Sequence, residues 1–538
     1  MPRLSAYILT LAGLTGAACS TAAWADCGNP QDSFSSVIPC YRAALASEPL
    51  DYHWLGSENL EQLELRHYSL NSQSWSPAGL VQPAVWQHDV DIYIPQNALS
   101  ARAVVFINNG TNNPEPGKPA KASTDMTREK LASLARNTRS IIVSVSNVPN
   151  QLLTYANDAQ AKAEDDSVAH SWSIFMQDPQ ATPTIPLHVP MAATVSQVMN
   201  LAERELDEWQ VKKFIVSGIS KRGWTTWLAA IADPRVEAIA PFAIDLLGIR
   251  PALKHMYRSY GNNWPVAFYP YFQKGVDTSV ETPQFAELMK IEDPLEYKDS
   301  AYGQRLEIPK YIINASGDDF YVPDNSRFYF DQLPGQKSLR MAPNSGHAGI
   351  RDFAEQSLTH FVNRIQQSQP LPVVTTALQE SQLKVTFSES PKELKLWQAV
   401  NPEARDFRHS CQIEYQAEAL PISESLNIKL ASPEKGWQAT YVEAIFADGF
   451  VATTPVYITP DDKYPTVAPA ENGPACKTLP GRGLGKVRNK EGNRRSRSVC
   501  DGKCGTLLLR FNHRFTTRGG FFPGGQLLSR LLIALRQH

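Results

Sequence analysis

The chain has 538 residues, of which 42% are hydrophobic and 20% are charged, and its formal net charge is −2. These values are typical of a globular protein long enough for more than one domain. The charge is uneven, because residues 477–538 carry 14 Lys and Arg against two acidic residues, which leaves about −14 on the rest. An acidic body argues against nucleic-acid binding by the residues before 477.

The N-terminus has the pattern of a secretory signal peptide. A mostly apolar or small stretch, Tyr7 to Ala18, precedes Ala23-Trp24-Ala25, which fits the small-x-small cleavage rule. The apolar stretch is shorter than the roughly 20 residues that a membrane span needs. We therefore expect residues 1–25 to be removed and the protein to be secreted or periplasmic. An oxidising compartment favours disulfides. Cys27 and Cys40 would close a short loop and are the pairing we expect, and the sequence does not pair the other cysteines.

Strand and helix patterns alternate up to about residue 210. Alternating aromatic and polar positions before Pro95 indicate antiparallel strands that open a sheet. The elements predicted next are a strand over residues 103–107, a polar turn over 108–113, a helix over 127–135, a strand over 140–145 and a helix over 190–209. This alternation favours a mostly parallel α/β sheet flanked by helices.

Residues 211–247 predict a strand, a tight turn and a helix, with Ser220 at the turn. Such a turn lifts the serine hydroxyl clear of the sheet and points the N–H of the next residue, Lys221, at a developing oxyanion. The segment departs from the Gly-x-Ser-x-Gly pattern, because Arg222 stands where a small residue is expected and Gly223 follows it. The alternative is that Ser220 only caps the helix.

Two later loops supply the partners that a nucleophilic serine needs. In α/β-hydrolases the order along the chain is serine, acid, histidine, and Ser220, Asp319 and His347 have that order, each just after a predicted strand. We expect His347 to take the hydroxyl proton and Asp319 to orient it. Asp318 is the alternative acid.

Three further predictions concern the surroundings of the serine. The second oxyanion donor is expected from the turn after residue 107, at Gly110 or alternatively Thr111. The acidic run at Glu164 and Asp165 could hold the amino terminus of a peptide substrate, and a solvated helix start is the alternative. Residues 248–305, rich in aromatic residues and proline, are predicted to form a cap over the carboxyl ends of the strands.

The pattern changes after Pro370–Pro372. Short alternating runs over residues 372–460 predict a small β-sandwich. Residues 461–538 are predicted to form a basic, disordered tail. Weak membrane contact by that tail is one alternative, and a shifted reading frame beyond residue 477 is another.

Residues 220–227, Ser-Lys-Arg-Gly-Trp-Thr-Thr-Trp, and 233–236, Asp-Pro-Arg-Val, resemble the PhoPQ-activated pathogenicity-related proteins. The resemblance covers about residues 40–460. It implies the α/β-hydrolase fold, similar to secreted peptidases and esterases, and it implies that this fold tolerates Arg222. Members carry an acidic pair where Asp318 and Asp319 stand, so the resemblance does not choose between them.

These observations together predict a secreted serine hydrolase that cleaves an ester or a peptide bond in a small molecule or peptide. A non-catalytic secreted binding protein is the alternative. We find no phosphate-binding glycine loop, dinucleotide fingerprint or metal-ligand cluster in the sequence, and therefore predict no cofactor and no metal.

Overall fold

The computed structural model describes residues 34–156 and 158–485. The expected signal peptide and the basic residues beyond 485 lie outside this part of the chain. Cys40 is disulfide-bonded, and Cys27, the partner predicted for it, also lies outside the described residues.

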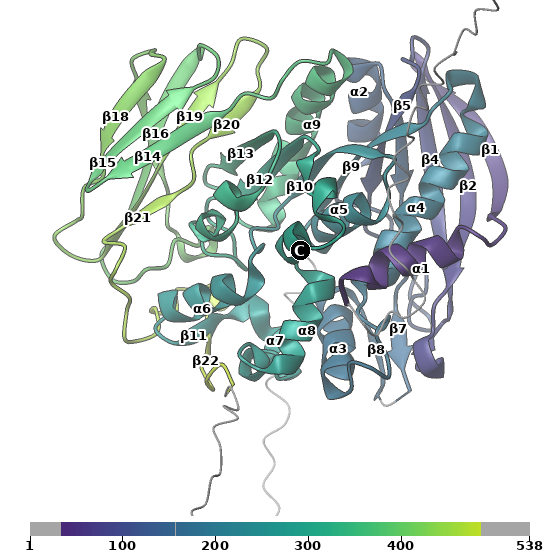
Figure 1. The fold of residues 1–538 in the computed structure, drawn as a ribbon, viewed down its shortest axis with the longest axis horizontal. Helices are drawn as coiled ribbons and strands as arrows, with labels where there is room; N and C mark the ends of the chain where they lie inside the picture. The colour runs from purple at the N-terminus through teal and green to yellow at the C-terminus, as the bar shows by residue number, and fades with distance from the viewer. Residues whose placement is uncertain (1–33, 157, 486–538) are drawn as a thin grey trace, which may run out of the picture. The chain divides into compact units, whose positions relative to one another are not determined.

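A nine-stranded sheet forms the centre of the described chain (Figure 1). The first three strands in the order pair antiparallel, and the third also pairs antiparallel with the fourth, whereas all later pairs are parallel. The order is β1 (Asp51–Leu60), β2 (Leu63–Ser74), β4 (Val85–Pro95), β6 (Ile141–Val145), β5 (Arg102–Ile107), β9 (Lys213–Ile219), β10 (Val236–Phe242), β12 (Lys310–Ala315) and β13 (Lys337–Ala342). This order confirms the predicted α/β-hydrolase fold.

Helices cover both faces of the sheet (Figure 1). Both faces are apolar, as two successive residues of β5 show. Val104 and Val105 are both fully buried, and they belong to two different hydrophobic cores, one on each face of the sheet. The core that contains Val104 is covered by α2 (Arg128–Thr138) and α9 (Arg351–Gln366). The other is covered by α1 (Val37–Leu45), α4 (His188–Glu205) and α5 (Lys221–Ala232).

A group of short helices follows β10 directly, where the sequence predicts a cap. Its helices are α6 (Ile249–Ser259), α7 (Tyr269–Gln273) and α8 (Pro283–Glu292), with the short strand β11 (Asn263–Pro265) between the first two (Figure 1). The indole N–H of Trp224, on α5, donates to the Glu292 carbonyl at the end of α8. The cap, residues 248–305, is therefore fastened to the helix that follows Ser220.

Two antiparallel sheets lie beyond α9 in the chain, as the predicted sandwich requires. Their inner faces share one core, in which Leu383 and Val385 of one sheet join Leu394 and Val442 of the other. One sheet holds β14 (Val374–Gln379), β15 (Gln382–Phe387) and β18 (Ser425–Lys429), and the other holds β16 (Glu393–Asn401), β17 (Gln416–Leu420), β19 (Trp437–Ile445), β20 (Val451–Thr453) and β21 (Tyr457–Thr459).

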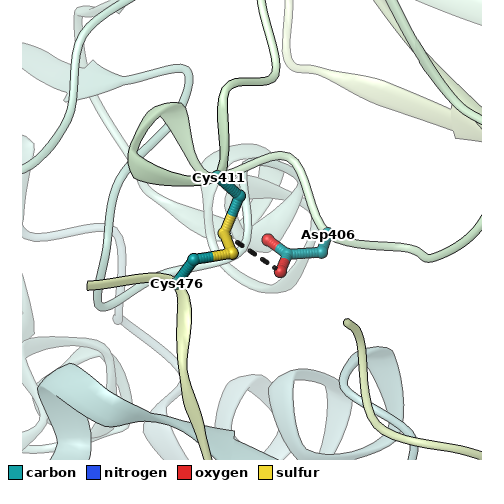
Figure 2. A group of neighbouring side chains, drawn as sticks. All are labelled: Asp406, Cys411 and Cys476. Carbon is teal, nitrogen blue, oxygen red and sulfur yellow. Dashed lines mark hydrogen bonds between the residues drawn. A yellow bond between two sulfur atoms is a disulfide. The ribbon is translucent and has the colours of Figure 1, made fainter. Parts of the chain in front are cut away.

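Residues 461–485, which we call the strap, are ordered, so their assignment to a disordered tail is wrong. Within the strap, β22 (Thr478–Pro480) pairs antiparallel with β11 of the cap, and Arg482 forms an ion pair with the buried Asp277 at 2.7 Å. A disulfide joins Cys476 of the strap to Cys411 (Figure 2). The strap has few apolar residues, and its order comes from partners more than 60 residues away, which local sequence does not reveal.

Candidate active site

Ser220 lies on a tight turn between β9 and α5. Its backbone angles, φ 60° and ψ −126°, fall outside the regions that residues other than glycine commonly adopt. Two glycines make the turn feasible, because a Cβ on Gly218 would lie 2.6 Å from the Arg222 carbonyl oxygen and one on Gly223 would lie 2.6 Å from that of Phe242. Strand, turn and helix therefore agree with the elbow that the sequence predicts.

Arg222 does not crowd this turn. Its side chain is 4% exposed, and it donates from Nε to Asp125 at 2.7 Å and from Nη1 to the Val148 carbonyl at 3.0 Å. Gly223, one position later, is the residue that packs against the backbone of β10. Because glycine stands one position later than in the common pattern, the close contact between α5 and β10 is kept at Gly223. The Arg222 side chain is then able to form ion pairs.

His347 connects Ser220 to an aspartate. Its Nε2 lies 2.8 Å from the Ser220 Oγ, and its Nδ1 lies 2.9 Å from Oδ2 and 3.1 Å from Oδ1 of Asp318. The Ser220 hydroxyl makes no capping hydrogen bond to α5, which removes the alternative of a simple helix cap. We call Ser220, His347 and Asp318 the candidate triad.

The choice of Asp319 as the partner of His347 is wrong in this geometry. The imidazole faces Asp318, which is 3% exposed and whose Oδ1 also accepts the N–H groups of Phe320 and Tyr321. Asp319 instead accepts the backbone N–H of His347 at 3.3 Å. Adjacent residues of one turn point in different directions, so sequence order alone could not separate the two carboxylates.

The surroundings of His347 favour its protonated form. Burial alone would lower its pKa, but the charge and hydrogen bond of Asp318, with a further contribution from Asp319, raise the pKa above the ordinary 6.5. The rings of Phe320 and Tyr321 lie 4.6 Å and 6.0 Å from the imidazole. The imidazole of His347 is thus held between a carboxylate and two aromatic rings.

Two backbone N–H groups can receive an oxyanion next to Ser220. Lys221 begins α5, and N–H groups in a first helical turn have no partner within the helix. The turn after β5 leaves the sheet beside the elbow, because Ile107 pairs with Gly218. Thr111 donates to the Lys121 carbonyl at 2.9 Å, which removes this alternative, whereas the Gly110 N–H donates to no other described residue. Gly110 remains the candidate second donor.

The acidic run at the start of α3 (Glu164–Gln177) is engaged within the protein. Lys221 Nζ lies 2.6 Å from Glu164 and 3.2 Å from Asp165, and Arg222 lies 3.2 Å from Glu164. Burial alone would raise the pKa of Glu164, but the two cations hold it well below its ordinary value. The predicted role in holding a substrate amine is not supported, because both carboxylates already have cationic partners.

Two more residues complete this cluster of charges. Asp125, which is fully buried, accepts from Arg222 on one oxygen and from Arg351 on the other, each at 2.7 Å. Three carboxylates and three cations therefore balance one another directly beside Ser220. We call this set the ion network: Asp125, Glu164, Asp165, Lys221, Arg222 and Arg351.

Comparison with known proteins places the chain in a family. The family model for the PhoPQ-activated pathogenicity-related protein matches residues 38–408, more than half of the chain. The chain belongs to this family. The resemblance carried by residues 220–227 is thereby confirmed. A relative in Dictyostelium discoideum, autocrine proliferation repressor protein A, is 30% identical over 441 residues, which cover 75% of this chain and 86% of the relative.

Solved structures are similar at lower identity. The acetyl xylan esterase from Paenibacillus sp. R4 has a TM-score of 0.40, and acetyl xylan esterase 1 from Thermoanaerobacterium sp. JW/SL YS485 has 0.41. Each is 13% identical, and each similarity covers 61% of this chain and 93% of the esterase.

Sequence reasoning missed two residues that support the site of this family member. Gln151 donates from Nε2 to the Gly110 carbonyl at 2.7 Å and to Glu164 at 2.9 Å, so it joins the oxyanion turn to the ion network. Tyr271 of the cap donates to Asp165 at 3.0 Å. Neither residue stands in a recognisable motif, and both act through contacts more than ten residues away.

Among the described residues, one group of side chains of the types that bind metals lies close together: Asp406, Cys411 and Cys476 (Figure 2). Both sulfur atoms are joined in the disulfide, so neither can bind a metal as a thiolate. Figure 2 shows the Asp406 carboxylate beside this bond, and its Oδ2 lies 3.5 Å from the Cys411 sulfur.

Among the helices of residues 34–156 and 158–485, none has the length and apolar character that a membrane span requires.

Proposed function

We propose that the protein is a secreted serine hydrolase that cleaves an ester or a peptide bond through an acyl-enzyme on Ser220. The observation that carries the proposal is the unbroken hydrogen-bonded line from Ser220 through His347 to Asp318, with contacts of 2.8 Å and 2.9 Å. These side chains come from loops that follow β9, β13 and β12, the edge where α/β sheets have their active sites. The strained backbone at Ser220 supports the same role.

The geometry supports a two-step reaction. Ser220 Oγ attacks the carbonyl carbon while His347 Nε2 takes the hydroxyl proton, and the Lys221 and Gly110 N–H groups would stabilise the oxyanion. His347 then gives its proton to the leaving alcohol or amine as the bond to the carbonyl carbon breaks. In the second step His347 takes a proton from water while the water oxygen attacks the acyl carbon. His347 then returns this proton to Ser220 Oγ as the bond from Oγ to the acyl carbon breaks, and the carboxylic acid leaves. Asp318 keeps its charge and orients the imidazole throughout.

Secretion is part of the proposal. The N-terminal pattern over residues 1–25 supports it, as do the disulfide between Cys411 and Cys476 and the disulfide-bonded state of Cys40. Disulfides persist mainly outside the reducing cytoplasm. Mass spectrometry of the mature N-terminus from culture supernatant or periplasm would test this part, with an unprocessed cytoplasmic chain as the contradicting result.

A panel of p-nitrophenyl esters and aminoacyl-coumarins tests the activity. We expect the wild type to hydrolyse at least one class and Ser220→Ala to reduce kcat/KM by about 10⁴-fold or more. Ser133→Ala, the same change on α2, should retain wild-type activity and thermal stability. If Ser220→Ala retains activity, the proposal is wrong.

A non-catalytic signalling role is the second candidate, and one relative's name, autocrine proliferation repressor, favours it. The same panel separates the two. A folded, secreted wild type that hydrolyses none of the substrates would favour binding without catalysis.

A further inference from the structure

A small, partly open cavity of about 20 Å³ lies between the cap and α5. Apolar and aromatic side chains line it, among them Trp172, Trp224, Leu246, Leu253, Met256 and Phe320. A single water molecule needs roughly 10–15 Å³ of such space. The cavity therefore has room for one group of the size of a methyl, and its lining suits an alkyl group better than a polar one.

Two residues that line the cavity contact the candidate triad. Trp224 lies one helical turn after Ser220 and donates its backbone N–H to the Ser220 carbonyl at 2.9 Å. Phe320 packs against the ring of His347, with 4.6 Å between the ring centroids. A third wall residue, Leu246, follows β10, the strand next to β9. Trp224 thus belongs to the helix that begins directly after Ser220, and Phe320 belongs to the loop that carries Asp318.

Several contacts hold the cap side of the cavity in place. Tyr271, which lines the cavity, donates to Asp165, and Asp165 in turn pairs with Lys221 beside the nucleophile. The Tyr271 ring also stacks on Phe268 with centroids 5.0 Å apart and an interplanar angle of 16°. The strap fixes the other side of the cap through β22 and the pair between Arg482 and Asp277. The part of the cap that lines the cavity is therefore held by hydrogen bonds, ring stacking and ion pairs.

We propose that this cavity is the acyl pocket and that it restricts the enzyme to short acyl groups of one or two carbons beyond the carbonyl. The proposal rests on Ser220 being the nucleophile. When Ser220 Oγ forms its bond to the carbonyl carbon, the alcohol leaves with the proton from His347, and only the acyl part remains on the enzyme. A small apolar pocket suits this retained part, whereas the alcohol must leave.

The size limit follows from rigid packing. A longer chain would have to displace fastened aromatic rings, and overpacking a close-packed interior is unfavourable. A difference of one methylene in an apolar pocket changes kcat/KM by roughly 10–200-fold. We therefore expect activity to fall at least about tenfold from acetyl to butyryl esters with the same leaving group.

Ethyl p-nitrophenyl alkylphosphonates that carry a methyl, propyl or hexyl chain test the pocket without requiring turnover. Ser220 Oγ forms a bond to phosphorus, p-nitrophenolate leaves, and the hydroxyl proton passes to His347. The rate of inactivation is followed by release of p-nitrophenolate and the adduct by intact mass. The ratio of the hexyl to the methyl rate within one preparation does not depend on the fraction of active protein.

Two methionine variants form a matched pair. Met256 of α6 lines the cavity, whereas Met289 of α8 is equally buried in the cap, 1% exposed, without lining it. Met256→Ala should raise the hexyl-to-methyl ratio about tenfold or more, and Met289→Ala should leave it within about twofold of the wild type. Leu246→Val, a smaller enlargement of the same cavity, replaces Met256→Ala if that variant does not fold.

The outcomes separate the two proposals. Fast reaction with the methyl compound, slow reaction with the hexyl compound and relief by Met256→Ala support the short-acyl pocket. If the methyl and hexyl compounds inactivate the wild type at equal rates, the short-acyl pocket is wrong, although Ser220 remains the nucleophile. The same conclusion follows if Met256→Ala and Met289→Ala change the hexyl-to-methyl ratio to the same extent. If the folded wild type reacts with none of the compounds, Ser220 is not an activated nucleophile and both proposals fail.

Discussion

Two groups of charges flank Ser220, and they differ in balance. On one side the candidate triad has one imidazole facing one buried carboxylate, Asp318, so its net charge changes when His347 gains a proton. On the other side the ion network pairs three cations with three carboxylates. The first arrangement has an imidazole that can accept a proton, whereas in the second every cation pairs with at least one carboxylate. We infer that the triad serves chemistry and that the ion network holds the elbow and the start of α3 in place.

Replacing the triad carboxylate should have the largest effect on activity. Asp318→Asn removes the charge that orients and stabilises His347, and we expect kcat/KM to fall about 10⁴-fold. Asp319→Asn keeps an oxygen that can accept the His347 backbone N–H, so a loss of about tenfold or less is expected. Steady-state kinetics on both variants, with circular dichroism as the folding control, make the comparison. Equal losses would contradict the assignment of Asp318.

Replacing an arginine of the ion network should affect stability instead. Arg222→Met removes one of the two cations that pair with Asp125 and one of the two that pair with Glu164. Breaking buried ion pairs in this way costs about 3–5 kcal/mol of unfolding free energy. Urea unfolding measures the loss. Arg128→Met, which breaks the exposed pair with Glu58, should cost about 1 kcal/mol or less. A similar small loss for Arg222→Met would show that the network does not hold the fold.

The disulfide between Cys411 and Cys476 lies near the loop that carries Asp318. His409, two residues before Cys411, donates its N–H to the Gly317 carbonyl at 3.0 Å, and Gly317 precedes Asp318. Replacing Cys411 and Cys476 with serine should lower the unfolding free energy by about 2–4 kcal/mol, because the bond closes a long loop in the unfolded chain. Thermal and urea unfolding measure this loss, and kcat/KM should change by only a few-fold. A fall in kcat/KM of much more than a few-fold, in a variant that stays folded, would mean that the disulfide sets the triad geometry directly.

The pH dependence should show the smallest effects. A protonated His347 cannot accept the Ser220 proton, so kcat/KM should fall as the pH drops through its pKa, which is raised above 6.5. The same raised pKa stabilises the folded state below pH 6.5, and that contribution is lost as the pH rises through the folded-state pKa. Asp319→Asn should move the acid limb slightly to lower pH. An acid limb well below pH 6 in the wild type would contradict His347 as the base.

Local patterns predicted much of the fold and part of the site. The strand, elbow and helix around Ser220 follow from an apolar run, two glycines and helical spacing, and all of these signals lie within about 20 residues. His347 followed from its place after the last strand of the sheet. These features could be predicted because short-range backbone geometry determines them.

The remaining features depend on contacts that the sequence does not display. Asp318 and Asp319 are neighbours with the same side chain, and only the turn decides which carboxylate faces the imidazole. The sequence does not reveal that Glu164 is paired, because its cationic partners, Lys221 and Arg222, are more than 50 residues away. The strap looked disordered for the same reason, since its order depends on a disulfide and on pairing with the cap.

Reaction of the secreted wild-type protein with a fluorophosphonate, followed by peptide mapping in a mass spectrometer, tests whether Ser220 is the nucleophile. We predict one adduct, on Ser220, and a reaction rate that drops by orders of magnitude in His347→Gln while the variant stays folded. A folded wild type that forms no adduct, or one that carries the adduct on another side chain, would contradict the account.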